Sequence, residues 1–362
     1  MKLNKTKAKS PSKFKNWLKS HRVFVLIISG ILLIGIAGVS AYYILGQPPV
    51  KVILNLPAPA PKPEPKFYSP LDGTQLKSEK GATKPVNAIM IENSVPARPQ
   101  SGLKESQVVF EAVAEGGITR FLTLHQTDTP KKIGPVRSIR PYYIDWLAPF
   151  DASIVHVGGS AAGKREARSG KFRDVDQFFN SSAYWRSSDR YAPHNVYTST
   201  KRLAALNKKK GYKTSKPKAF DRKDSQAADK PTATKIKVTI SGSEFNSVYK
   251  YNKKTNTYDR SQGGAPHKDR EKGTISPRVV IVMKQKMTAP GGYREKITTK
   301  GSGTAYVFQD GTVQKVKWHK KSQFGQMYFT DSEDKHVELA RGQTWLVSLP
   351  TNKSVSWTGP SE

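Results

Sequence analysis

Cysteine is absent from the sequence, which excludes disulfide bonds, thiolate nucleophiles and cysteine metal ligands. Acidic residues are scarce, since 28 Asp and Glu stand against 61 Lys and Arg in 362 residues and leave a formal charge of +33. Walker loops, dinucleotide fingerprints and kinase motifs are also missing. We therefore expect no cofactor and no nucleotide-driven chemistry. Hydrophobic residues, at 36%, are sufficient for a folded core, so a fully disordered chain is not expected.

Residues Val23 to Leu45 form 23 consecutive, mostly apolar positions without a charged residue. At about 1.5 Å per residue a helix of this length spans a hydrocarbon core of roughly 30 Å, so we predict a transmembrane helix over residues 23–45. Residues 1–22 form a basic tail with eight Lys and Arg and no acid, which the positive-inside rule keeps in the cytoplasm. We predict a single-pass plasma-membrane protein whose bulk is extracytoplasmic. A cleaved signal peptide is the alternative, although its apolar core is normally shorter.

Four further parts follow the apolar run. Residues 46–66 contain seven prolines and are typical of an extended stalk. Between residues 67 and 211 strand-like apolar runs alternate with helical patterns, which indicates an α/β domain. Residues 212–235 are polar and are predicted to be a linker or a large loop. Residues 236–355 are rich in short β segments and include the hairpin signal Asp310-Gly311, so we predict a mostly antiparallel β domain.

Several individual elements can be placed within these domains. Ser199 is a plausible N-cap for a helix from Thr200 to Lys210 that ends at Gly211. Trp318 and Trp345 lie in alternating strand patterns, which favours core positions over a sugar-binding or nucleic-acid-binding role. Strands of the first domain are predicted at residues 86–92, 107–114, 119–126 and 151–157.

The part of the chain beyond Leu45 is strongly basic, with 53 Lys and Arg against all 28 acids. Such an excess of about +25 favours anionic surroundings. Outside the membrane these would be phosphate-bearing wall polymers or lipid headgroups, whereas nucleic acid is an unlikely partner there. An envelope protein is another partner that we consider, and the alternative explanation of the charge is solubility.

Five polar stretches of the first domain form a distinctive set: PARPQSG (96–102), EAVAEGGITRF (111–121), GPVRSIRPYY (134–143), HVGGS (156–160) and RYAPHN (190–195). The set continues with APHKD (265–269) and RGQTW (341–345). Taken in this order, the motifs resemble the YerB-like lipoproteins, a two-domain family of the bacterial envelope without an established activity, over roughly residues 68–350. The resemblance implies an envelope location but no reaction. Members of this family are typically anchored through a lipidated cysteine, so here the helix over residues 23–45 would replace that anchor.

Arginines within these stretches are the first candidates for ligand binding. They lie beside Gly, Pro or strand ends, where loops gather, and a guanidinium can bind phosphate or carboxylate with two parallel hydrogen bonds. The alternative is an internal ion network with Glu92, Glu111, Glu115 and Asp145. The candidate arginines are Arg98, Arg120, Arg137, Arg140 and Arg190.

Gly158, Gly159 and Ser160 follow a predicted strand and precede a predicted helix, a geometry in which backbone N–H groups can hold an anion. Lys164 and Arg165 would add positive charge there, whereas the alternative is a simple turn.

His156 and His194 are candidates for acid–base chemistry or ligand binding. Ser160 with one of these histidines and with Asp145 or Asp189 would complete a nucleophilic triad. However, Ala162 stands where the G-x-S-x-G elbow requires glycine.

These observations predict a membrane-anchored envelope protein that binds an anionic ligand or partner through its first domain. The alternative is a hydrolase or transferase acting on a cell-wall polymer, with His156, His194, Glu111 and Glu115 as candidate catalytic residues. A third alternative is a purely structural interaction module. His267 and Asp269 lie two residues apart but lack a companion metal motif, so we predict no metal site.

Overall fold

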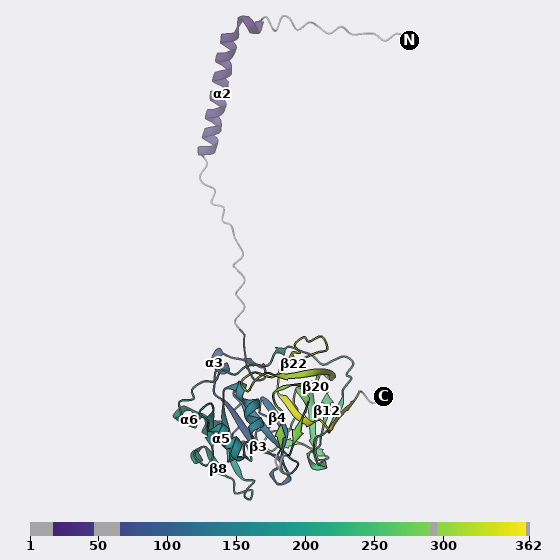
Figure 1. The fold of residues 1–362 in the computed structure, drawn as a ribbon. Coiled ribbons are helices and arrows are strands. Elements are labelled where there is room, and N and C mark those ends of the chain that lie inside the picture. The colour runs from purple at the N-terminus through teal and green to yellow at the C-terminus, as the bar shows by residue number, and fades with distance from the viewer. Residues whose placement is uncertain (1–16, 47–65, 290–294, 360–362) are drawn as a thin grey trace, which may run out of the picture. The chain divides into compact units, whose positions relative to one another are not determined.

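A computed structural model describes residues 17–46, 66–289 and 295–359, which form two separate units. The first unit contains helix α2 (Arg22–Leu45), shown in Figure 1. By length and composition this helix can cross a membrane. The predicted stalk lies, except for its two end residues, outside the described residues.

The second unit is built around a ten-stranded mixed sheet with the strand order β22-β21-β20-β17-β24-β4-β5-β3-β6-β7. Strands from the predicted α/β domain and from the predicted β domain join in this one sheet, because Val109 of β4 pairs in parallel with Trp345 of β24. The strands are β3 (Val86–Glu92), β4 (Val108–Glu115), β5 (Ile118–His125), β6 (Ala152–His156), β7 (Arg173–Asp176), β17 (Val279–Gln285), β20 (Gly301–Gln309), β21 (Thr312–Lys320), β22 (Tyr328–Thr330) and β24 (Thr344–Pro350).

Seven of these strands, β3, β4, β6, β7, β17, β21 and β24, run in the same direction. Strand β5 lies between β3 and β4 and is antiparallel to both. The carboxyl ends of the seven strands therefore meet at one edge of the sheet, where β3 ends at Glu92, β4 at Glu115 and β6 at His156. We call this the carboxyl edge.

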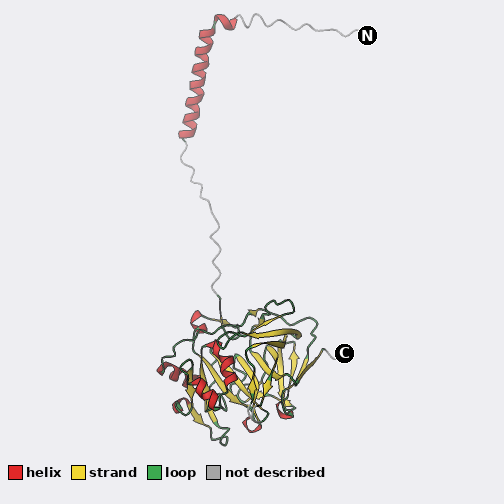
Figure 2. Ribbon diagram, in the orientation of Figure 1, coloured by secondary structure: helices red, strands yellow, loops and turns green. Residues whose placement is uncertain are grey.

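Both faces of the ten-stranded sheet are covered, as Figure 2 shows. One core contains Ala88 and Met90 of β3 and residues of helix α4 (Pro141–Leu147). The other core contains Ile89 and Ile91, residues of helix α6 (Thr200–Lys209) and a second, five-stranded sheet. Because successive side chains of a strand point to opposite faces, one strand supplies both cores.

The second sheet has the order β14-β13-β12-β11-β25, and all its neighbouring strands are antiparallel. The α/β character of the first domain and the mostly antiparallel character of the second are thus both confirmed. The strands of this sheet are β11 (Lys235–Thr239), β12 (Ser247–Asn252), β13 (Thr257–Gln262), β14 (Ala265–Pro266) and β25 (Ser354–Thr358). Short elements complete the unit: β1 (Phe67–Tyr68), β2 (Gln75–Leu76), α3 (Glu79–Ala82), α5 (Ala161–Ala167), β8 (Tyr184–Arg186), β9 (Val196–Thr198), β10 (Arg222–Lys223), β15 (Lys268–Asp269), β16 (Gly273–Thr274), β18 (Met287–Thr288), β19 (Lys296–Ile297), β23 (Leu339–Ala340) and the 3-10 turns η1 (Val95–Ala97), η2 (Ala148–Phe150), η3 (Ser181–Ala183) and η4 (Ser243–Phe245).

Local signals in the sequence are confirmed at several positions. The Ser199 hydroxyl accepts a hydrogen bond from the Arg202 N–H and caps α6. Asp310 and Gly311 have φ angles of 58° and 79° and join β20 to β21, as a tight hairpin turn requires. Trp318 and Trp345 are buried, as predicted for core residues.

Candidate functional site

The five motif stretches all reach the carboxyl edge. Residues 96–102 follow β3, residues 156–160 begin at the end of β6, and the β4–β5 turn lies within residues 111–121. Residues 134–143 enter between the ends of β3 and β6: the Arg137 N–H donates to the Met90 carbonyl at 2.9 Å, and the Val157 N–H donates to the Arg137 carbonyl at 3.0 Å. Residues 190–195 approach the same edge from the β8–β9 loop, because His194 pairs with Glu92 at the end of β3.

A cleft of about 550 Å³ opens at this edge, and we call it the histidine cleft. His194 Nδ1 lies 2.9 Å from Glu92 Oε1, and the Ser94 hydroxyl donates to the same oxygen at 2.7 Å. Arg137 Nε lies 3.2 Å from the other Glu92 oxygen. Glu92 is almost fully buried and therefore orients the imidazole, whose Nε2 has no partner among the described residues. The cleft is lined by Pro96, Pro99, Asp189, Arg190, Tyr191, His194 and Arg270.

The histidine cleft carries an excess of positive charge. Arg190 donates to the carbonyl groups of Pro96 and Pro99 at 2.8 and 2.6 Å and has no carboxylate partner among the described residues. Asp189 is shared by Lys132 at 3.4 Å and Arg270 at 2.6 Å. The hydrogen bond from Ser187, together with these two cations, lowers the pKa of Asp189 to about 2. Asp189 is thus ionised at neutral pH and is not a proton donor.

A larger hollow of about 790 Å³, the edge cavity, lies beside α4, α5 and β19. On its wall, Arg140 pairs with Glu115, and Arg120 pairs with the same carboxylate at 3.3 Å. The two arginine side chains are only 5% and 12% exposed. The lining residues are Arg140, Pro141, Tyr142, Asp145, Ser160, Ala161, Ala162, Arg165, Glu295, Lys296, Ile297, Thr298, Thr299 and Lys300.

Two guanidinium groups therefore share one carboxylate at the edge cavity. Burial opposes ionisation of Glu115, yet the two arginines hold its pKa below the usual value. Burial and the charge of Arg120 in turn lower the pKa of Arg140. One positive charge at the cavity wall remains without a counter-charge in this group.

Two predicted catalytic residues lie away from both hollows. His156 is fully buried, with Nε2 at 2.7 Å from Asp174 and Nδ1 at 2.6 Å from the Gly158 carbonyl. Glu111 is buried against Arg260 at 2.8 Å. The polar atoms of both side chains are used in internal contacts, and the catalytic role of these residues stays a prediction.

The predicted nucleophilic triad is not assembled. The Ser160 hydroxyl accepts a hydrogen bond from the Gly163 N–H and caps α5, while His156 and His194 pair with Asp174 and Glu92. Asp145 accepts hydrogen bonds from Thr299 and Gln323 instead.

Two backbone N–H groups of the glycine turn have internal partners. The Gly158 N–H donates to Asp176 at 3.0 Å, and the Ser160 N–H donates to the Ile139 carbonyl at 3.3 Å. A Cβ at Gly159 would lie 2.7 Å from the Ile139 side chain, so close packing explains this glycine. The turn is thus closely packed, Ser160 lines the edge cavity, and the anion cradle stays a prediction.

The remaining candidates have structural partners. Arg98 donates to the side chain and the carbonyl of Asn93 and does not line either hollow. His267 is buried, with Nε2 at 3.0 Å from Gln100. The described residues include no group of three or more acidic or histidine side chains that could hold a metal ion.

Two residues at the histidine cleft were not predicted from the sequence to belong to a binding site. Glu92 was considered only as a member of an ion network, and Arg270 directly follows the APHKD motif without having been noted. The only signals for them were a strand-end carboxylate and a basic residue beside a motif.

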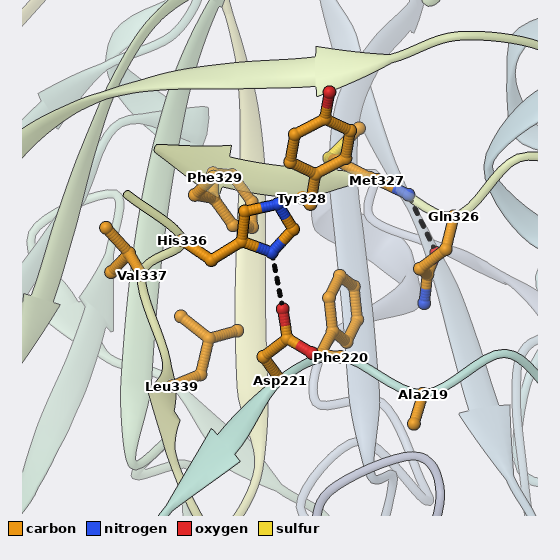
Figure 3. A pocket seen from close by; sticks show the side chains of 10 residues that line it. All are labelled: Ala219, Phe220, Asp221, Gln326, Met327, Tyr328, Phe329, His336, Val337 and Leu339. Atoms are coloured by element: carbon orange, nitrogen blue, oxygen red, sulfur yellow. Dashed lines mark hydrogen bonds and ion pairs between the residues drawn. The ribbon is translucent and has the colours of Figure 1, made fainter. Parts of the chain in front are cut away.

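A third hollow, of about 210 Å³, contains none of the predicted site residues (Figure 3). His336 pairs with Asp221 at 2.9 Å and stacks on the ring of Tyr328, while the other lining side chains are mostly apolar. Ligand pockets usually have volumes of about 300–1,000 Å³, so this hollow is small for that purpose.

Comparison with known proteins adds three findings. A family model described as "Protein of unknown function (DUF3048) N-terminal domain" matches residues 71–213, and the model of the DUF3048 C-terminal domain matches residues 236–346. "Putative lipoprotein YerB" of Bacillus subtilis (strain 168) is 31% identical over 291 residues, which cover 79% of this chain and 87% of that protein. The crystal structure of YerB from Bacillus subtilis superposes with a TM-score of 0.71 at 28% identity, covering 80% of this chain and 100% of that chain.

Proposed function

The chain belongs to the DUF3048 family, a family of unknown function that includes YerB, and on this premise we propose that it is a membrane-anchored envelope protein that binds an anionic ligand at the carboxyl edge. Helix α2 supports the anchor, because it is long and apolar enough to cross a membrane. The description of YerB as a lipoprotein supports an envelope location. This chain has no cysteine for lipidation, so α2 takes the place of a lipid anchor.

The shared carboxylate at the edge cavity is the observation that carries the proposal. Arg120 and Arg140 are nearly buried, and among the described residues their one ion-pair partner is Glu115. A buried charge without a partner costs several kcal/mol, so an anion in the cavity would stabilise the arrangement. Arg165 and Lys296 also line the cavity and would add to the attraction.

Calorimetry on the full chain in a non-ionic detergent tests this proposal with tripolyphosphate as the probe. We expect binding at low salt that weakens at high salt, and a loss of about tenfold or more in affinity for Arg140→Gln, because a charge-assisted hydrogen bond contributes roughly 1.5–3 kcal/mol. Lys237→Gln, an exposed change of equal charge on β11, serves as the control and should bind normally. Absence of binding at both salt concentrations would refute the proposal.

The orientation of the chain has its own test. In intact protoplasts, protease added outside should digest the part of the chain that follows α2, since that part is extracytoplasmic in this proposal. Full protection until the membrane is opened with detergent would show the opposite orientation.

A second candidate function is acid–base catalysis on a cell-wall polymer, and the pairing of His194 with Glu92 favours it. A buried carboxylate that orients an imidazole in an open cleft is a typical arrangement of a general base. In this case His194→Gln abolishes turnover of the polymer while binding is retained. Equal losses of binding and turnover would leave anion binding as the function.

A further inference from the structure

One short segment of chain reaches both the histidine cleft and the edge cavity. Residues 134–140 place Arg137 against Glu92 at the cleft and Arg140 at the wall of the cavity. Since three residues of fully extended chain span about 10 Å at most, the two arginine backbones lie within that distance. Arg137, beside the cleft, and Arg140, in the wall of the cavity, therefore lie close together at the carboxyl edge.

Each hollow has its own uncompensated positive charge. In the cleft, Arg190 has no carboxylate partner within the described part of the chain, and Lys132 and Arg270 share Asp189. In the cavity, Arg120 and Arg140 share Glu115. Arg165 and Lys296 line the cavity and form no ion pair with the part of the chain that the structure describes. A compact anion in one hollow would leave the charge of the other unbalanced.

The size and the charge arrangement of the hollows also indicate the kind of anion. Volumes of about 550 and 790 Å³ suit drug-sized ligands, so one phosphate group would fill only a small part of either. Four cations line the cavity, Arg140 before α4, Arg165 in α5, Lys296 in β19 and Lys300 after it, and they outnumber the two lining carboxylates, Asp145 and Glu295. Cations from several directions suit the tetrahedral oxygens of phosphate better than a planar carboxylate, and guanidinium groups bind phosphate with paired hydrogen bonds.

We infer that the ligand is a linear polymer with repeated phosphate groups, which occupies the histidine cleft and the edge cavity at the same time. This inference rests on the proposed anion binding and adds the class of ligand. Linkage of two contacts in one chain raises the effective concentration at the second contact, and the gain in affinity can reach about 100-fold or more.

The test compares tripolyphosphate with long-chain inorganic polyphosphate, using the full chain in a non-ionic detergent and affinities expressed per phosphate residue. We expect the long chain to bind at least about tenfold more tightly per residue. In Arg190→Gln and Arg270→Gln the ratio of long-chain to short-chain affinity should fall toward one, whereas Arg140→Gln weakens the binding of both probes. Lys237→Gln is the matched control, and thermal unfolding verifies that each variant is folded.

Equal affinities per residue for the two chain lengths would overturn the inference while leaving the proposed function intact, provided that tripolyphosphate binding still depends on Arg140. A length advantage that survives both cleft substitutions would also overturn it. Tighter binding of a polyuronate of similar length would refute the assignment to phosphate. If no anion binds at all, the proposed function fails as well.

Discussion

Replacing Glu111 by glutamine tests whether the pair that joins the two domains is structural. Glu111 of β4 accepts hydrogen bonds from Arg260 of β13 at 3.0 and 2.8 Å and from the Trp345 indole at 3.0 Å. The side chains of Glu111 and Arg260 are 1% and 0% exposed. Glutamine keeps an oxygen for Trp345 but removes the negative charge, so the Arg260 guanidinium would be left buried without a counter-charge.

The expected cost follows from the burial of the pair. Removing one partner of a buried ion pair costs about 3–5 kcal/mol in the free energy of unfolding. The compact unit spans Pro65 to Glu362. With an unfolding entropy of about 2.1 cal/mol/K per residue, the midpoint temperature of this unit should fall by about 5–8 °C.

Scanning calorimetry of the full chain in a non-ionic detergent measures this change, with Glu333→Gln as the matched control. Glu333 pairs with Lys335 at 2.6 Å, but both side chains are about 70% exposed, so this pair contributes less than about 1 kcal/mol. Equal midpoints for the two variants would show that the buried pair does not stabilise the unit. Loss of a turnover activity at unchanged stability would instead support the catalytic role that the sequence suggested for Glu111.

Two further predictions concern stability. Burial lowers the pKa of His125 to about 3, whereas an unfolded histidine titrates near 6.5, so the free energy of unfolding decreases as the pH falls below about 6.5. In denaturant titrations, His125→Gln should reduce the decrease between pH 7 and pH 5 by about 2 kcal/mol. A decrease equal to that of the unsubstituted chain would contradict this prediction. Gly311→Ala should destabilise the chain more than Gly264→Ala does. Both glycines have φ near +80°, but a Cβ at Gly311 would lie 2.5 Å from Tyr251, whereas a Cβ at Gly264 would meet no atom within 4 Å. Equal thermal midpoints for the two variants would contradict the steric argument.

Local patterns in the sequence were sufficient for individual elements. The apolar run 86–92 is β3 itself, and the helix that begins after Ser199 ends within a residue of its predicted end. The Asp310-Gly311 turn joins two long strands as expected. These features depend on neighbouring residues, through side-chain periodicity, capping and turn conformation, so they can be recognised without knowledge of the rest of the chain.

The gathering of all five motif stretches at one edge could not be recognised in this way. It depends on the parallel course of strands such as β4 and β24, which are far apart in the chain, and on the insertion of residues 134–143 between β3 and β6. The same long-range packing buried Glu111 and His156 and left His194 in an open cleft, although all three are polar residues within motifs. The burial and the ion pairing of these residues depend on contacts between segments that are distant in the chain. The spacing of residues along the sequence therefore does not predict which polar residues are buried.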